Sequence, residues 1–136
     1  MRRIFVDTGA FVALRNASER EHKRARLALE ELTSKRVPLF TSNYVFAETY
    51  TVLLMRVGWN AAVAWGRALR DGSLVELIRI DEALEDRAWS ILEAHDDKRW
   101  SYVDATSFAL MDQEGASEAF SFDRDFVQRG LSVIPG

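Results

Sequence analysis

The chain has 136 residues, of which 48% are hydrophobic and 29% are charged, and it contains no cysteine. This length suits one domain with a sizeable core, and the lack of cysteine excludes disulfides, thiolate catalysis and Cys-based metal sites. The net charge of −3 at pH 7 argues against a surface coated with basic charge for non-specific nucleic-acid binding. It does not exclude nucleic acid, because an acidic metal site lowers the net charge even where its rim is basic.

No internal repeat, low-complexity segment or Pro/Gly-rich linker interrupts the sequence. We therefore expect a single domain over residues 1–136. No apolar run approaches the roughly 20 residues that span a membrane, and Arg2-Arg3 leads directly into an apolar strand. These features predict a soluble, cytoplasmic protein with no membrane partner.

The first half of the chain predicts strands alternating with helices. Residues 4–6 form a short buried strand, and the capping-box pattern of Ser18 to Glu21 predicts a helix after it. Residues 37–40 form a second apolar strand. Helices are then expected over residues 44–57 and 60–70, with Asp71-Gly72 ending the second.

The second half continues in the same way. It predicts a strand over 74–80, a helix capped by Asp81 and running to about residue 94, a helix over 102–111 capped by Ser101, and short strands over 119–122 and 131–134. Strands alternating with helices indicate an α/β domain with a mainly parallel central sheet and helices on both sides. Ligands of such sheets bind beyond the carboxyl ends of the strands, where Asp7 and the Asp123 region are expected.

Four acids each stand as the lone charge of an apolar stretch. Asp7 ends the strand "IFV", Glu48 lies in "YVFAETYTVLLM", Asp104 lies in "SYVDATSFALM", and Asp123 ends "AFSF". A lone carboxylate in an apolar element is costly unless it meets a cation, hydrogen-bond donors or a metal. Carboxylate oxygens suit Mg²⁺ or Mn²⁺, so four that converge at one sheet edge indicate a hard-cation site.

Each acid also has a plainer interpretation. Asp7 can cap a helix that opens at Thr8-Gly9, and Asp104 can be the acidic member of a capping box that begins at Ser101. Asp123 can be an ordinary turn residue. Two opposite faces of the helix that carries Glu48 are apolar, so we expect this helix to be buried on most sides. In such a helix Glu48 can form a buried ion pair with an arginine such as Arg56.

Basic residues outside the acidic set are candidates for contacts to phosphate. The Lys98-Arg99-Trp100 segment precedes the expected helix that carries Asp104, and it suits either RNA contact by charge and stacking or a plain polar loop. The arginines that we consider candidate phosphate contacts are Arg15, Arg99, Arg124 and Arg129.

Four segments together resemble a PIN-domain nuclease, and specifically the VapC-type toxins of bacterial and archaeal toxin–antitoxin pairs. These segments are "IFVDTGAFVAL", "TSNYVFAETYTVL", "WSYVDATSFALM" and "AFSFDRDFVQRGLSVIP". Each segment alone is a modest match, but their order and spacing along the whole chain are specific to the family.

The resemblance implies a catalytic and metal-binding quartet formed by Asp7, Glu48, Asp104 and Asp123. It implies supporting roles for Thr8 and Ser121, whereas Asp125 lies where the family often has a further acid or another polar residue, so its role stays open. The resemblance also implies a parallel sheet between helices, one or two Mg²⁺ or Mn²⁺ ions, cleavage of single-stranded RNA by metal-activated water, a homodimer, and inhibition by a cognate antitoxin.

Several other functions fit the same sequence less well. A stand-alone PIN-family RNase without an antitoxin, or a PIN-like module that binds RNA or protein without cutting, shares the resemblance. A haloacid-dehalogenase-type phosphatase needs a second aspartate where this chain has Gly9. A response-regulator receiver domain needs an acidic pair near the first strand and a phosphorylatable aspartate in mid-chain, and the strand expected over 74–80 reaches Asp81 only at its far end.

Overall fold

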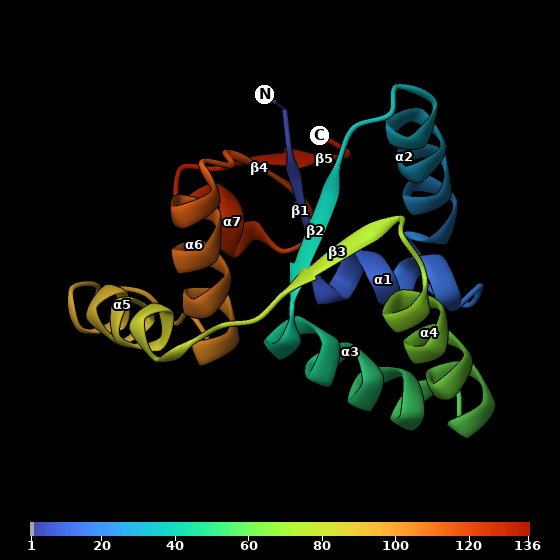
Figure 1. Cartoon of the computed structure of the whole chain (residues 1–136), viewed down its shortest axis with the longest axis horizontal. Helices are drawn as coiled ribbons and strands as arrows, with labels where there is room; N and C mark the ends of the chain where they lie inside the picture. The colour runs from blue at the N-terminus through green and yellow to red at the C-terminus, as the bar shows by residue number, and fades with distance from the viewer. Residues whose placement is uncertain (1) are drawn as a thin grey trace.

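The computed structural model describes residues 2–136. Five strands within this range form one sheet in the order β3-β2-β1-β4-β5, and every neighbouring pair is parallel (Figure 1). The strands are β1 (Ile4–Val6), β2 (Leu39–Ser42), β3 (Val75–Ile78), β4 (Glu118–Phe120) and β5 (Ser132–Ile134). The expected α/β architecture with a parallel sheet is therefore confirmed.

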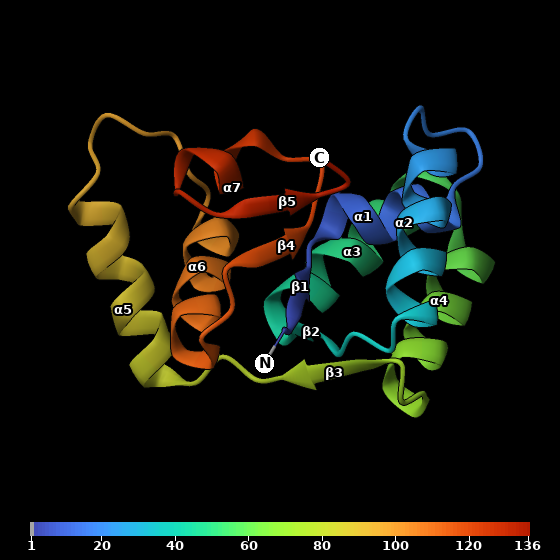
Figure 2. The ribbon, with the colours of Figure 1, turned by 90° about the horizontal axis from the view of Figure 1, so that it is seen from above.

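Helices cover both sides of this sheet. Figure 2 shows α1, α2 and α4 on one side and α5, α6 and α7 on the other, while α3 lies below the carboxyl ends of the central strands in Figure 1. The helices are α1 (Thr8–Arg15), α2 (His22–Ser34), α3 (Asn43–Arg56), α4 (Trp59–Asp71), α5 (Glu82–Glu93), α6 (Tyr102–Glu114) and α7 (Arg124–Gln128). Among residues 2–136, no helix combines the length and apolar character needed to cross a membrane.

The hydrophobic core lies on both faces of β1, whose three residues are all buried. Successive side chains of a strand point to opposite faces. Phe5 packs edge-on against Phe40 and is stacked with Phe126 of α7, with ring centroids 5.6 and 6.2 Å apart. Val6 faces α1 on the other side and lines a hollow with Phe11. Both helical layers are thus anchored on the strand that ends at Asp7.

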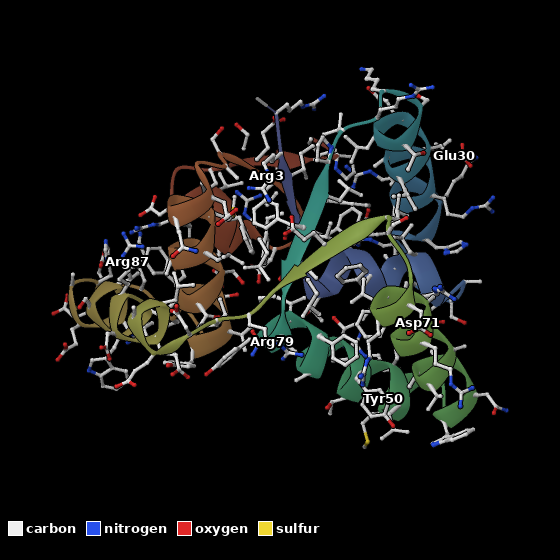
Figure 3. All side chains as sticks on the ribbon, viewed as in Figure 1. Arg3, Glu30, Tyr50, Asp71, Arg79 and Arg87 are labelled. Atoms are coloured by element: carbon white, nitrogen blue, oxygen red, sulfur yellow. The ribbon has the colours of Figure 1, made fainter. Side chains whose placement is uncertain are left out.

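Charged side chains at the amino ends of the strands, opposite the edge that carries Asp7, form ion pairs. The Arg3 guanidinium lies over the Phe40 ring, 4.7 Å from its centroid, and pairs with Glu76 and Glu114 (Figure 3). Arg3 therefore neutralises acids of β3 and α6 and ties these elements to β1. The two ends of the sheet differ in this respect: one has paired charges, and the other gathers acids.

Two of the expected helix caps are confirmed: Asp81 accepts from the Leu84 amide and Ser101 from the Asp104 amide. Ser42 also caps α3, because its hydroxyl accepts from the Val45 amide. The capping box expected at Ser18 is wrong, because α2 begins only at His22. The residues before it form a turn in which the Asn16 side chain accepts from the Ser18 amide, so they are not available to a helix.

The expectation that the helix carrying Glu48, α3, is buried on most sides is also wrong. Within α3 only Val45, Thr49 and Leu53 are buried, whereas 78% of Met55 is exposed. The reason is that α3 extends past the sheet. Its contacts with other helices are with α1, α4 and α6, and these leave part of its surface uncovered. An apolar strip at the end of α3 and the start of α4 therefore lies at the surface; its residues are Leu54, Met55, Val57 and Trp59.

Candidate active site

Five acids line one hollow of about 440 Å³ at the carboxyl ends of β1 and β4. They are Asp7, Glu48, Asp104, Asp123 and Asp125. The other residues that line it are Thr8, Gly9, Arg99, Ser101 and Phe122. The parallel topology places β1 and β4 side by side, so residues more than a hundred positions apart meet at this edge. All four acids of the predicted quartet are thus brought together.

Asp7 follows β1 directly and is only 6% exposed. It occupies the position before α1, but its side chain makes no capping hydrogen bond to that helix. Its carboxylate instead accepts a hydrogen bond from the Ser121 hydroxyl, at 3.1 Å. Burial, reinforced by the negative charges of Asp123 and Glu48, raises the pKa of Asp7 to about 7. The helix-cap interpretation therefore does not account for this carboxylate.

Asp104 has two roles in the structure. It completes the capping box of α6, since its carboxylate accepts from the Ser101 amide at 3.1 Å and its own amide donates to the Ser101 hydroxyl. It also lines the acidic hollow and is 8% exposed. Burial, a side-chain hydrogen bond with Asp125, and the charges of Asp123 and Asp7 raise the pKa of Asp104 to about 7. The capping interpretation is correct but incomplete.

Asp123 and Asp125 belong to the turn that opens α7. The Asp123 carboxylate accepts from the Asp125 amide at 2.9 Å, so Asp123 caps this short helix. Asp104, Asp123 and Asp125 each place one carboxylate oxygen within 4.8 Å of the others. Burial also raises the pKa of Asp123, and the charge of Asp125 adds to this effect. The fifth acid, whose role the sequence left open, thus lies beside two members of the quartet.

Glu48 reaches the hollow from α3 and is half-buried. The ion pair with Arg56 that the sequence allowed does not form, because Arg56 pairs with Glu19 at 2.9 Å. Among the described residues, Glu48 takes part in no ion pair. Its charge instead contributes to raising the pKa of Asp7. Glu48 therefore faces other acids without a protein cation.

Two residues with hydroxyl side chains, Ser121 and Thr8, lie next to the acids. The Ser121 hydroxyl donates to Asp7 and accepts from the Asp123 amide at 3.0 Å, so it links two members of the quartet. The Thr8 hydroxyl is buried and has no hydrogen-bond partner within residues 2–136. A buried hydroxyl without a partner is costly unless a ligand or water satisfies it.

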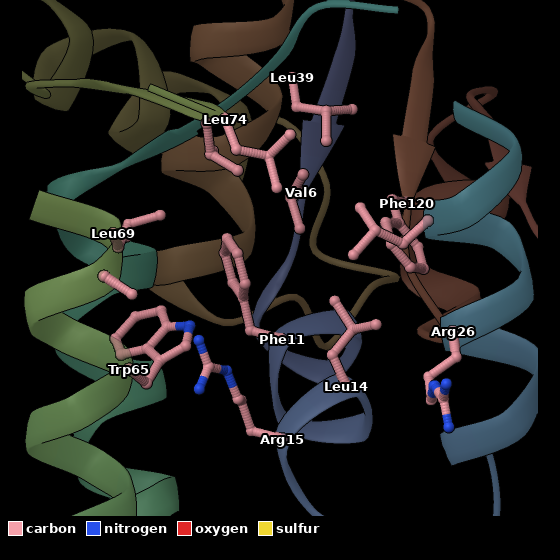
Figure 4. A pocket seen from close by; sticks show the side chains of 13 residues that line it. Val6, Phe11, Leu14, Arg15, Arg26, Leu39, Trp65, Leu69, Leu74 and Phe120 are labelled. Atoms are coloured by element: carbon pink, nitrogen blue, oxygen red, sulfur yellow. The ribbon is translucent and has the colours of Figure 1, made fainter. Parts of the chain in front are cut away.

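The four candidate arginines lie in different parts of the structure. Arg99 lines the acidic hollow, held by hydrogen bonds from its guanidinium to the carbonyl oxygens of Asp96 and Lys98. Arg15 lies in a different hollow, beside Trp65 between α1 and α4 (Figure 4).

The other two arginines lie on or near α7. Arg129 lies over the rings of Trp100 and Phe108 and 3.9 Å from an Asp112 carboxylate oxygen. Arg124 is exposed at the start of α7. Only Arg99 is in place to meet a group bound at the acids.

Sequence reasoning did not single out Gly9 and Phe122 as parts of the site, and it assigned Ser101 only a capping role. Each of the three lies within three positions of a predicted acid, and this proximity was the available signal. Their contribution depends on how α1 and the turn after β4 fold back over the sheet edge, which residue patterns do not reveal.

The donor set fits a divalent cation. It offers carboxylate oxygens from several elements with no nitrogen or sulfur ligand, which is the preference of Mg²⁺ and Mn²⁺. Burial is the main cause of the raised pKa values of Asp7 and Asp104, and the negative charges of neighbouring acids in the hollow add to it. A bound cation would relieve the repulsion between these charges.

Comparisons with known proteins agree with this geometry. The family model for the PIN domain matches residues 4–130. The chain is 42% identical over 131 residues to the 23S rRNA-specific endonuclease VapC20 of Mycobacterium tuberculosis, covering 96% of this chain and 97% of that protein.

Solved structures agree as well. The crystal structure of M. tuberculosis VapC20, described as a Sarcin-Ricin loop cleaving toxin, matches with a TM-score of 0.85 and 41% identity over 94% of this chain and 95% of that one. VapBC2 from Rickettsia felis matches with a TM-score of 0.71 at 16% identity, covering 96% of each chain, and shows the fold alone. The chain therefore belongs to the PIN-domain family, whose members are metal-dependent nucleases.

Proposed function

We propose that this protein is a divalent-metal-dependent endoribonuclease that hydrolyses single-stranded RNA in the cytoplasm, with residues 1–136 as one nuclease domain. The observation that carries the proposal is the convergence of two buried carboxylates, Asp7 and Asp104, with three further acids in one open hollow. The similarity to VapC20, which is named for cleavage of 23S rRNA, supports RNA as the substrate class.

The chain's own residues have distinct proposed roles. Asp7 and Asp104 are the principal ligands, Asp123 is a ligand or holds the attacking water, and Glu48 is a ligand or the general base. Ser121 fixes the orientation of Asp7 through its hydrogen bond. A bound Mg²⁺ or Mn²⁺ would supply activation of water and stabilisation of the charge that develops on the phosphodiester. Asp125 has a supporting role, because its carboxylate lies beside those of Asp104 and Asp123.

Incubation of the purified protein with single-stranded RNA tests this proposal. RNA should be cut in Mn²⁺ or Mg²⁺ and should remain intact when EDTA removes the metal. RNA that binds and is never cut under any of these conditions would favour a non-catalytic binding module.

Arg99 is the proposed phosphate contact. In Arg99→Ala, we expect KM for RNA to rise about ten- to hundredfold with kcat changed much less, because a lost charge-assisted hydrogen bond removes about 1.5–3 kcal/mol of binding. Arg87→Ala on α5 (Figure 3) is the matched control and should behave as wild type. Steady-state kinetics on one oligoribonucleotide measures both. An unchanged KM in Arg99→Ala would remove Arg99 from the site.

A homodimer is part of the proposal. The exposed apolar strip at the end of α3 and start of α4 is a surface that a second copy would cover. Light scattering after gel filtration should give twice the 15.5 kDa mass of the chain. A mass of one chain at all concentrations would contradict the dimer.

We also propose a cognate antitoxin as partner, because VapC20 is described as a toxin. An apolar hollow of about 320 Å³ lies between α1, α2 and α4, with Arg15 and Arg26 among its lining residues (Figure 4). It would suit an apolar protein segment that carries acidic residues. Co-purification with the product of the neighbouring reading frame tests this partner, and active enzyme without any such complex would favour a stand-alone RNase.

A further inference from the structure

A second hollow of about 220 Å³ opens beside the acidic one. Three residues line both hollows: Thr8, Gly9 and Phe122. The second hollow is therefore a continuation of the site, on the side of α1 and α3. A strand of RNA whose phosphate is bound at the acids would therefore bring a neighbouring nucleotide close to this second hollow.

The chemistry of this second hollow differs from that of the first. Its walls are mostly apolar, formed by Val12, Ala13, Val52 and the aromatic ring of Phe122. Its polar lining includes Glu19, which is paired with Arg56. Apolar and aromatic walls with a few polar groups suit a planar ring system, since every nucleobase has an apolar face that stacks on aromatic side chains. The charged groups of the lining are Glu19, Glu21 and Arg56, and their net negative charge disfavours a phosphate group there.

Gly9 lies where the two hollows meet, in the first turn of α1. Its backbone is not in the left-handed region that favours glycine, and a Cβ added there meets no atom within 4 Å. Neither backbone conformation nor packing therefore requires glycine, although glycine is less favourable than alanine in a helix. Gly9 lines both hollows, and a side chain added there would begin in open space.

We infer that the hollow lined by Phe122, Val52 and Val12 seats the nucleobase of a nucleotide next to the cleaved phosphate, with Gly9 keeping the passage to the acids open. This inference rests on the proposed ribonuclease function. It adds a base-binding subsite to that function, and thereby a source of sequence preference.

The test uses one single-stranded oligoribonucleotide whose cleavage site has been mapped, in Mn²⁺. Two further versions carry an abasic ribose on one side or the other of the cleaved phosphate. In the wild type, the abasic substitution on one side should lower kcat/KM about tenfold, because stacking of a base contributes on the order of 1–3 kcal/mol. The substitution on the other side should have a smaller effect.

Gly9→Leu fills the passage and should cut the intact oligonucleotide about as slowly as the wild type cuts the sensitive abasic version. In this variant the abasic substitution should cause no further loss. Ala64→Leu adds the same side chain at an exposed position of α4 and should keep the wild-type pattern. Melting curves should show Gly9→Leu folded, since the added side chain points into open space.

The outcomes separate the subsite from the nuclease. If the wild type cuts no RNA in Mn²⁺, the proposed function itself fails. If the wild type cuts RNA but tolerates both abasic substitutions, the subsite is refuted and the nuclease stands. The subsite is refuted equally if Gly9→Leu cuts the intact RNA like wild type, or loses the same factor on intact and abasic RNA.

Discussion

Replacing Asp7 with asparagine should lower RNA cleavage on the order of a thousandfold, with the protein still folded. Asparagine keeps the shape of the side chain and can still accept the hydrogen bond from Ser121, but it removes the negative charge that a divalent ion needs. Each 1.4 kcal/mol of lost transition-state stabilisation costs tenfold in rate, and a metal centre supplies several kcal/mol. Initial rates of oligoribonucleotide cleavage in Mn²⁺ measure the loss.

Asp71→Asn provides the matched control. Asp71 ends α4, is exposed, and lies away from the acidic hollow (Figure 3). The same chemical change there should leave cleavage at the wild-type rate. Equal cutting by Asp7→Asn and wild type would point to a contaminating nuclease or to a different site.

The metal-free protein should become less stable as the pH rises from about 4 to about 7. Asp7 titrates near its ordinary pKa of 3.8 when unfolded and at about 7 when folded. Between these values the folded state holds a proton that the unfolded state has released, so unfolding becomes easier with rising pH. Asp104, whose pKa is also raised to about 7, acts in the same direction. The effect of Asp7 alone is on the order of a few kcal/mol in the free energy of unfolding.

Urea denaturation in EDTA at pH 5 and pH 8 measures this effect. The wild type should lose stability between the two values, whereas Asp7→Asn, which cannot ionise, should lose less. At pH 8 the variant should therefore be the more stable of the two proteins. A wild type that gains stability by pH 8, with Asp7→Asn showing the same profile, would contradict the strained acidic cluster.

The acidic quartet was visible in the sequence for a physical reason. A carboxylate that is the only charge in an apolar element needs a compensating environment, and the parallel topology brings the ends of β1 and β4 together. The same logic overestimated the burial around Glu48. The apolar residues of this helix predict a position inside the core, but Met55 and its neighbours are at the surface. Sequence patterns do not distinguish an apolar face that meets the core from one that meets a partner.

A helix-capping pattern in the sequence did not decide whether an aspartate also belongs to the acidic hollow. Asp104 and Asp123 both cap helices, yet both also line the acidic hollow. In each case the carboxylate accepts one hydrogen bond from a backbone amide at the start of the helix, which leaves its remaining lone pairs for another ligand. The short helix α7 was not predicted, because five residues carry too little periodicity, whereas a helix opening at Thr8-Gly9 was one interpretation of the sequence and α1 begins there. The second hollow is formed where α1, α3, the turn before α2 and the turn after β4 meet, and residue patterns do not predict how these segments pack together.

The central claim is that these acids form a divalent-metal site, and melting in Mn²⁺ at neutral pH tests it most directly without any RNA. At a Mn²⁺ concentration about 100 times its Kd, the Tm of the wild type should rise by roughly 10 °C, because the ion binds the folded state and relieves the repulsion among the acids. In Asp7→Asn the rise should disappear. A rise of the same size in Asp7→Asn would show that Mn²⁺ binds elsewhere and would contradict the assigned site.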